Sequence, residues 1–114
     1  MSNLLHNKGK ESELPMHELH KTPEFEEWLS EQPLKSRLQI EERLMHIICD
    51  GHFGTCKRLT NLIWELKWAN GRRVYYAYLA EYNILLLLGG NKNGQSKDIT
   101  QAKKILGKCT EASP

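Results

Sequence analysis

Cysteine is scarce in this 114-residue chain, and the few cysteines it has fit no common framework. Cys49, Cys56 and Cys109 are odd in number and show no CxxC spacing, so we expect reduced thiols rather than disulfides or a zinc site. Neither a metal ion nor a cofactor is expected from the sequence.

Long hydrophobic runs are also missing. No apolar stretch approaches the length of a membrane span, and the N-terminus "MSNLLHNKGKESELP" lacks the continuous apolar core of a signal peptide. We see no internal repeat and no low-complexity segment. These absences predict a cytoplasmic protein that makes no contact with a membrane.

A strong net charge is absent too, but the value of +2 hides an asymmetry along the chain. Residues 1–33 carry seven acids and three bases, a balance of −4, whereas residues 34–114 carry thirteen bases and seven acids, a balance of +6. A basic later part gives the chain an electrostatic reason to meet a polyanion such as RNA or DNA. The alternative is that these lysines and arginines only keep the protein soluble.

The length fits one domain, which we place at residues 15–107 between a disordered tail at 1–14 and a C-terminal tail at 108–114. A short strand near residues 16–20 is possible. "TPEFEEWLSEQP" predicts a first helix, with Thr22 as N-cap and Pro23 at the first helical position. "LKSRLQIEERLMHIICDG" predicts a second helix, which Gly51 ends.

From Leu62 the hydrophobic period changes from 3.6 to 2, which is typical of strands. "ANGR" is a hairpin signal, "RVYYAYL" the return strand, and "YNILLLL" a third strand, apolar on both faces and therefore central. Ser96 is expected to cap a C-terminal helix. The predicted fold is α+β: two N-terminal helices packed on a small antiparallel sheet of three to four strands, followed by that helix. The expected core comprises Leu66, Trp68, Val74, Tyr76, the run 84–88, Trp28, Ile40, Leu44 and Ile47.

The hairpin register decides which side chains share a face of the sheet. A two-residue turn would put Arg73 beside the tryptophans on the apolar face, where a guanidinium is costly. A loop of odd length, such as residues 70–72, avoids this. We therefore expect an exposed sheet face that carries Glu65, Lys67, Arg73 and Tyr75.

Four strings together resemble the RelE/ParE toxin superfamily, in its HigB-like branch of addiction-module killer proteins. They are "FEEWL", "RLMHIICDGHFGTCKRL", "WELKWANGRRVYYAY" and "ILLLLGGNKNGQSKDITQAKKI", and they span roughly residues 15–107. The family's usual "ELR" is here Glu65-Leu66-Lys67, and a lysine cannot bind a phosphate bidentately as arginine does.

This resemblance implies a bacterial type II toxin that cleaves messenger RNA on the ribosome. Its implied partners are the mRNA, the ribosome and a cognate antitoxin, and operator DNA would be bound only through the antitoxin complex. Metal-independent cleavage uses the 2′-hydroxyl as nucleophile and needs a proton acceptor, cations for the phosphoryl oxygens and an acid for the leaving oxygen. The catalytic candidates are Arg73, Lys92, Lys67 and Tyr75. The RNA-binding candidates are Lys57, Arg58, Arg72 and Lys97.

Each candidate also has an ordinary structural interpretation. Lys57 and Arg58 suit a solvated loop before the sheet. The structural alternative for Lys92 is to fill a turn, and for Tyr75 it is packing across strands. Lys67 or Lys92 would act as base only with a lowered pKa, and His46 or His52 are further candidates with structural alternatives. Gly89 and Gly90 are interpreted as serving backbone geometry.

Two other functions remain open at this stage. The superfamily that the chain resembles includes inhibitors of DNA gyrase, which cleave nothing themselves. A non-catalytic, RNA-binding module derived from a prophage is the other possibility. Because one fold supports many functions, only the residues of the site can separate these hypotheses.

Overall fold

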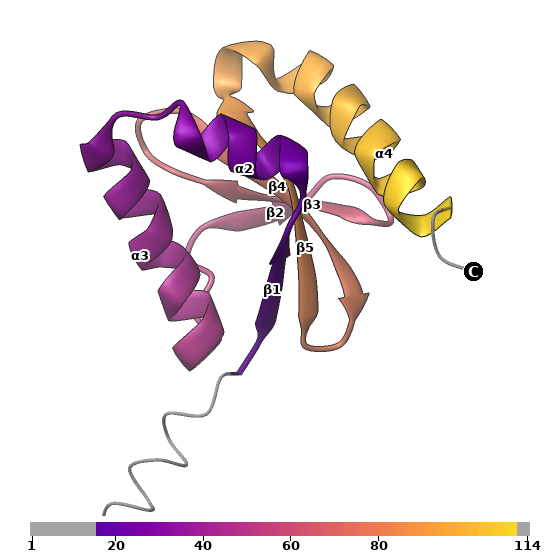
Figure 1. Ribbon diagram of the computed structural model, residues 1–114, viewed down its shortest axis with the longest axis horizontal. Coiled ribbons are helices and arrows are strands. Elements are labelled where there is room, and N and C mark those ends of the chain that lie inside the picture. The colour runs from indigo at the N-terminus through magenta and orange to yellow at the C-terminus, as the bar shows by residue number, and fades with distance from the viewer. Residues whose placement is uncertain (1–15, 112–114) are drawn as a thin grey trace, which may run out of the picture.

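The computed structural model describes residues 16–111, so the tail predicted at residues 1–14 lies outside the described part. The elements are β1 (Glu18–Lys21), α2 (Pro23–Ser30), α3 (Leu34–Asp50), β2 (Cys56–Arg58), β3 (Ile63–Lys67), β4 (Arg72–Ala80), β5 (Asn83–Asn91), the 3₁₀ turn η1 (Lys92–Gly94) and α4 (Gln95–Glu111) (Figure 1). The last helix thus continues past residue 107, where we expected the domain to end. None of the helices within residues 16–111 is long and hydrophobic enough to cross a bilayer.

The five strands form one sheet in the order β1-β5-β4-β3-β2. All neighbours are antiparallel except β1 and β5, which run parallel. The predicted α+β fold is confirmed, but the sheet has five strands instead of three to four. The possible strand near residues 16–20 is β1. We expected Lys57 and Arg58 in a loop, but they lie on the edge strand β2.

Local signals account for most of the helix ends. The Thr22 hydroxyl accepts a hydrogen bond from the Phe25 N–H at 3.0 Å, and Pro23 occupies the first turn of α2, as predicted. Gly51 ends α3 in the left-handed conformation. The cap predicted at Ser96 is wrong: Asn91 caps η1 through the Asn93 N–H, and α4 continues directly from η1.

The β3–β4 hairpin has the face assignment that the sequence predicted. Lys67 pairs with Arg73 and Glu65 with Tyr75, so Arg73 lies on the face opposite the tryptophans. The loop comprises residues 69–71 instead of 70–72, and the Trp68 N–H donates to the Arg72 carbonyl at 3.0 Å. This shift by two in the pairing leaves every side chain on its predicted face.

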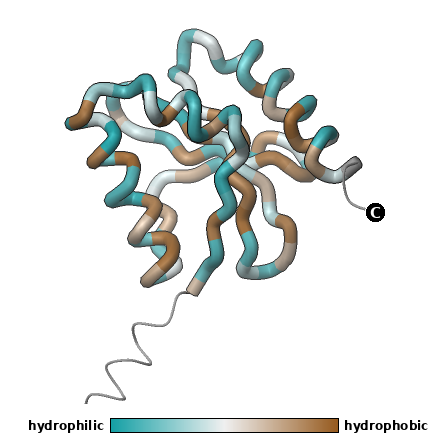
Figure 2. Tube along the Cα trace, viewed as in Figure 1, coloured by the Kyte–Doolittle hydropathy of each residue, from teal (hydrophilic) through white to brown (hydrophobic). Residues whose placement is uncertain are grey.

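One face of the sheet packs against α2 and α3. The buried members of this core are Phe25, Leu29, Ile40, Leu44, Ile47, Leu66, Val74, Tyr76, Ile84 and Leu86. Most of the predicted core residues are among them, whereas Trp28 and Trp68 are only partly buried against the cluster. Hydrophobic residues follow the central strands and recur along the helices (Figure 2).

The other face of the sheet is covered by α4, so our expectation that it is exposed is wrong (Figure 1). Its buried residues are Ile63, Tyr75, Ala77, Leu85, Leu87, Ala102, Ile105 and Leu106. The apolar side of α4 has to be buried, and this face of β4 and β5 supplies the matching surface. The residues expected on an open face therefore lie beneath or beside a helix.

Gly89 and Gly90 let both layers approach the end of β5 closely. A Cβ on Gly89 would overlap the Trp28 indole, and a Cβ on Gly90 would collide with the Asp98 carboxylate. Neither glycine has a positive φ, so the interpretation as special backbone geometry is corrected. The two glycines instead allow α2 to pack closely on one face of the strand and the first turn of α4 on the other.

Candidate functional site

Three sequence-predicted cations lie at the same end of the sheet, where β3 and β5 end and β4 begins. Lys67 and Arg73 are direct cross-strand partners, and the next position across the sheet is Gly90. Lys92 follows β5, and its N–H donates to the Gly71 carbonyl at 2.8 Å. Its side chain lies beside Gly71, and the φ of 98° at Gly71 is the reason that glycine is favoured there.

Arg73 is more enclosed than the sequence predicted, with only 11% of its side chain exposed. Its Nη1 donates to the Arg72 carbonyl at 2.9 Å and to the Trp68 carbonyl at 3.3 Å. Its Nε lies 3.7 Å from a Glu65 carboxylate oxygen. Within residues 16–111, Nη2 has no hydrogen bond and remains the nitrogen able to meet a phosphate.

Glu65 is fully buried beneath the start of α4. One carboxylate oxygen accepts a hydrogen bond from Gln95 Nε2 at 2.6 Å and faces Arg73. The other oxygen has no hydrogen-bond partner among the described residues. Charged groups avoid such burial unless they are paired, so Arg73 is the counter-ion that makes this position tolerable.

Tyr75 cannot stack on a base, because its side chain is fully buried opposite Glu65. Burial, with a smaller contribution from Glu65 and Asp98, raises the pKa of Tyr75 to about 12. The phenol is therefore neutral at physiological pH. Its hydroxyl has no hydrogen-bond partner within residues 16–111. Burial also raises the pKa of the neighbouring Asp98 carboxyl.

Two RNA-binding candidates share the side of the sheet that carries Arg73. Lys57 pairs with Glu65 across β2 and β3 and therefore projects to the same side, where it is exposed. Lys97 is exposed in the first turns of α4. Lys92, in η1, is exposed as well.

Arg58 and Arg72 are not part of this group. Arg58 pairs with Trp64, so it projects to the face of α2 and α3, where its guanidinium lies 5.8 Å from the Trp64 ring. Arg72 lies on that face too, 5.4 Å from the ring of Trp68, and donates to Gln39 at 3.3 Å. Burial lowers the pKa of Arg72. The predicted RNA-binding set is therefore divided between two faces.

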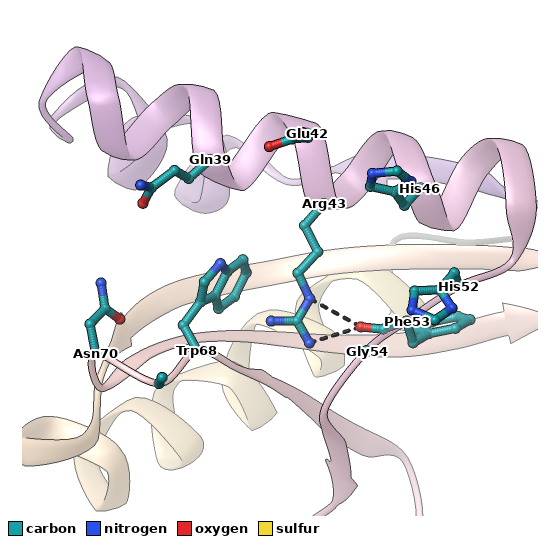
Figure 3. Close-up of a pocket in the computed structure, with 10 residues that line it drawn as sticks. Gln39, Glu42, Arg43, His46, His52, Phe53, Gly54, Trp68 and Asn70 are labelled. Carbon is teal, nitrogen blue, oxygen red and sulfur yellow. Dashed lines mark hydrogen bonds between the residues drawn. The ribbon is translucent and has the colours of Figure 1, made fainter.

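A groove of about 590 Å³ opens between α3 and the ends of the β3–β4 hairpin (Figure 3). Arg43 reaches across it from α3 and donates to the Phe53 carbonyl, at 3.0 Å from Nε and 2.8 Å from Nη2. It also donates to the carbonyls of Thr55 and Lys67, and it lies 4.3 Å from the Trp68 ring. Arg43 thus connects α3 to the loop before β2 and to the end of β3, and these hydrogen bonds occupy its guanidinium.

The two histidines considered as bases lie at the rim of this groove (Figure 3). His46 lies 3.5 Å from Asp50 on its own helix, and His52 follows the end of α3. Both are on the side of α3, whereas Lys67 and Arg73 face α4. A histidine therefore does not join the cation group.

Sequence reasoning missed the importance of Glu65, Gln95 and Arg43. A signal for Glu65 was present: "YNILLLL" is apolar on both faces, so both faces of the sheet had to be covered. The C-terminal helix was the one predicted element left to cover the second face, and Glu65 lies on that face. No sequence pattern that we used identifies Gln95 or Arg43, because their partners are distant backbone and side-chain oxygens.

The fold matches that of RelE toxins. A double arginine-to-alanine mutant of the E. coli toxin RelE in the free state aligns with a TM-score of 0.63 and 15% identity, over 78% of this chain and 96% of that chain. The isolated E. coli RelE toxin aligns with a TM-score of 0.56 and 14% identity, over 75% and 97%. At such low sequence identities, these alignments show a RelE-like fold and nothing finer.

A sequence relative gives the family. An uncharacterized protein of Haemophilus influenzae (strain ATCC 51907 / DSM 11121 / KW20 / Rd) is 36% identical over 85 residues, which is 71% of this chain and 84% of that protein. The chain belongs to the same family as this Haemophilus protein. No protein-family model matches the sequence.

Proposed function

We propose that the protein is the toxin of a type II toxin–antitoxin system, of the HigB-like branch, and acts as a ribosome-dependent mRNA endoribonuclease. The observation that carries this proposal is the convergence of Lys67, Arg73 and Lys92 at one end of a RelE-like sheet. They come from β3, β4 and η1, which are separate in sequence. Such a group suits a phosphate whose negative charge grows during cleavage.

The proposed reaction begins with attack of a 2′-hydroxyl on the adjacent phosphorus. Arg73 binds a phosphoryl oxygen through Nη2 and stabilises its charge. Lys67 or Lys92 takes the hydroxyl proton on its free amine, and the other lysine, as an ammonium, donates a proton to the leaving 5′-oxygen. Tyr75 is excluded as a contact by its burial, so its part in the reaction is not retained. The attacking bond forms as the bond to the 5′-oxygen breaks, and no metal ion takes part.

The substrate is proposed to enter at the end of the sheet and not across its face. Helix α4 covers the face beyond Tyr75, so the accessible charges are those around the 69–71 loop and η1. Lys57 and Lys97 then hold flanking phosphates. Arg58 and Arg72 lie on the opposite face, so they would contact RNA only if the RNA strand wrapped around the edge of the sheet.

The decisive experiment incubates purified protein with translating ribosomes and a defined mRNA, and maps the cut ends. Cleavage within the ribosome-bound codon, lost in Lys92→Ala and retained in Lys104→Ala, supports the proposal. Lys104 is a matched control, because it is an exposed cation on α4 that lies about 14 Å along the helix from its first residue, Gln95. Intact mRNA with arrested DNA supercoiling would instead support a gyrase inhibitor, and binding without cleavage would support a non-catalytic module.

A small antitoxin encoded beside the gene is the proposed protein partner. A basic surface attracts an acidic segment that neutralises it and blocks access. Expression of this chain alone should arrest growth, and co-expression with the adjacent open reading frame should restore it. The complex, but not the toxin alone, should shift operator DNA in a gel. Growth that continues when the chain is expressed alone would contradict the toxin assignment.

A further inference from the structure

Glu65 is a fully buried carboxylate in a neighbourhood of cations. Its cross-strand partners are Lys57 on β2 and Tyr75 on β4, and the Arg73 guanidinium lies 3.7 Å away. Within residues 16–111 its Oε1 has no hydrogen-bond partner, and neither has the buried Arg73 Nε. The arrangement is therefore charged, enclosed and incompletely satisfied.

Stability alone does not account for this arrangement. A buried ion pair is often no better for stability than two apolar residues of the same volume, and an unsatisfied polar network is worse. Proteins retain such costs most often at functional sites. The polar cluster also interrupts an otherwise hydrophobic layer between α4 and the sheet. This points to a role in the site that the cluster supports.

The Glu65 carboxylate holds two elements at once. It faces Arg73 on β4, and it accepts a hydrogen bond from Gln95, the first residue of α4, at 2.6 Å. Gln95 follows Lys92 by three residues, and η1 is the short turn between them. One carboxylate thus fixes the distance between the Arg73 guanidinium and the turn that carries Lys92.

We propose that Glu65 is a positioning residue: it aligns Arg73 with the Lys92 turn so that both cations meet the same phosphate. This inference rests on the proposed nuclease function. Because Glu65 is enclosed, it does not touch RNA, and it acts only through Arg73 and Gln95. Misplacement of catalytic groups by about 1 Å can slow a reaction by roughly a hundredfold, so the expected effect falls on kcat.

The test uses the full chain and three variants. Glu65→Gln removes the charge that faces Arg73, and Gln95→Leu removes the hydrogen bond at the start of α4 while keeping the side-chain size. Gln101→Leu is the matched control, since Gln101 is exposed on the same helix. All assays are run well below each melting temperature, with kcat and KM measured on programmed ribosomes. The Arg73 Nε–H resonance is followed by NMR.

We expect kcat to fall by about tenfold to a hundredfold in Glu65→Gln and Gln95→Leu, with KM changed less than about threefold. The Arg73 resonance should move in both variants, and Gln101→Leu should behave as wild type. If Glu65→Gln does not fold, Gln95→Leu decides the matter alone.

The outcomes separate this inference from the function on which it rests. A wild-type protein that cleaves while Gln95→Leu keeps full kcat, or loses only affinity, would overturn the positioning role alone. A wild-type protein that cleaves no RNA overturns the proposed function and the positioning role together. In that case the NMR measurement still reports whether Glu65 holds Arg73 as part of the fold.

Discussion

Replacing Arg73 with alanine should cost the fold much more than its sequence context suggests. On an open sheet face the change would be mild, but α4 covers this face. In the folded protein Arg73 is the counter-ion of a fully buried carboxylate, and the Gln95 amide is the other group that Glu65 contacts. Removing one partner of a buried pair leaves an uncompensated charge.

The expected loss in the free energy of unfolding is about 3–5 kcal/mol for Arg73→Ala. In a domain of this size that corresponds to a fall in melting temperature of roughly 10 °C or more. Arg73→Lys keeps the charge but not the planar fork, so its loss should be smaller. Urea unfolding at constant pH, followed by circular dichroism, measures each value.

The double variant Glu65→Leu/Arg73→Met provides the sharpest check of this reasoning. Replacing both partners of a buried pair by apolar residues of similar volume is often neutral or stabilising, so the double variant should recover most of the loss. The reasoning would be refuted if Arg73→Ala cost less than about 1 kcal/mol. It would equally fail if the double variant were as unstable as the sum of its two single variants.

Three further predictions separate charge, packing and protonation. Lys92→Ala should change stability by no more than about 0.5 kcal/mol because the residue is exposed, yet it should abolish mRNA cleavage; a thermal melt and the ribosome assay on one preparation measure both. Leu86→Ala should lose about 2–5 kcal/mol in urea unfolding because it opens a cavity in the α2/α3 core, and it should lose activity only as far as it unfolds. Burial raises the pKa of Tyr75 to about 12, from about 10 in the unfolded chain. Its contribution to stability is therefore complete below pH 10 and is lost as the pH rises toward 12. Tyr75→Phe should weaken this loss of stability in unfolding curves recorded between pH 10 and 12, and a pH dependence equal to that of the wild type would contradict the prediction.

The helices, the central strand and the face assignment of the hairpin were predictable because each depends on local chemistry. Thr22 and Gly51 mark helix ends through backbone geometry that the sequence states directly. The position of Arg73 opposite the tryptophans followed from the cost of burying a guanidinium among apolar side chains. The edge strand β2 was not predictable in this way, because three exposed residues carry no hydrophobic period.

The environment of the site was less predictable because it depends on which element covers which face. The strand pattern placed Glu65, Lys67, Arg73 and Tyr75 together correctly, but it gave the same alternation for an open face and for a face beneath an amphipathic helix. The hydrogen bond between Glu65 and Gln95, thirty residues apart, shows that α4 begins over this cluster. Long-range contacts of that kind have no local signal.

The position of α4 changes what the cation group can recognise. An open face with Tyr75 at its centre would bind an RNA strand by stacking and by phosphate contacts along the sheet. With Tyr75 buried, the proposed catalytic contacts are Lys67, Lys92 and the outer nitrogen of Arg73, all at one end of the sheet. If the protein is the ribosome-dependent nuclease proposed above, such a site would contact phosphates and no base, and selection of the cleaved codon would then come from how the ribosome presents the strand. Cleavage of free RNA should then be weak and nearly independent of sequence.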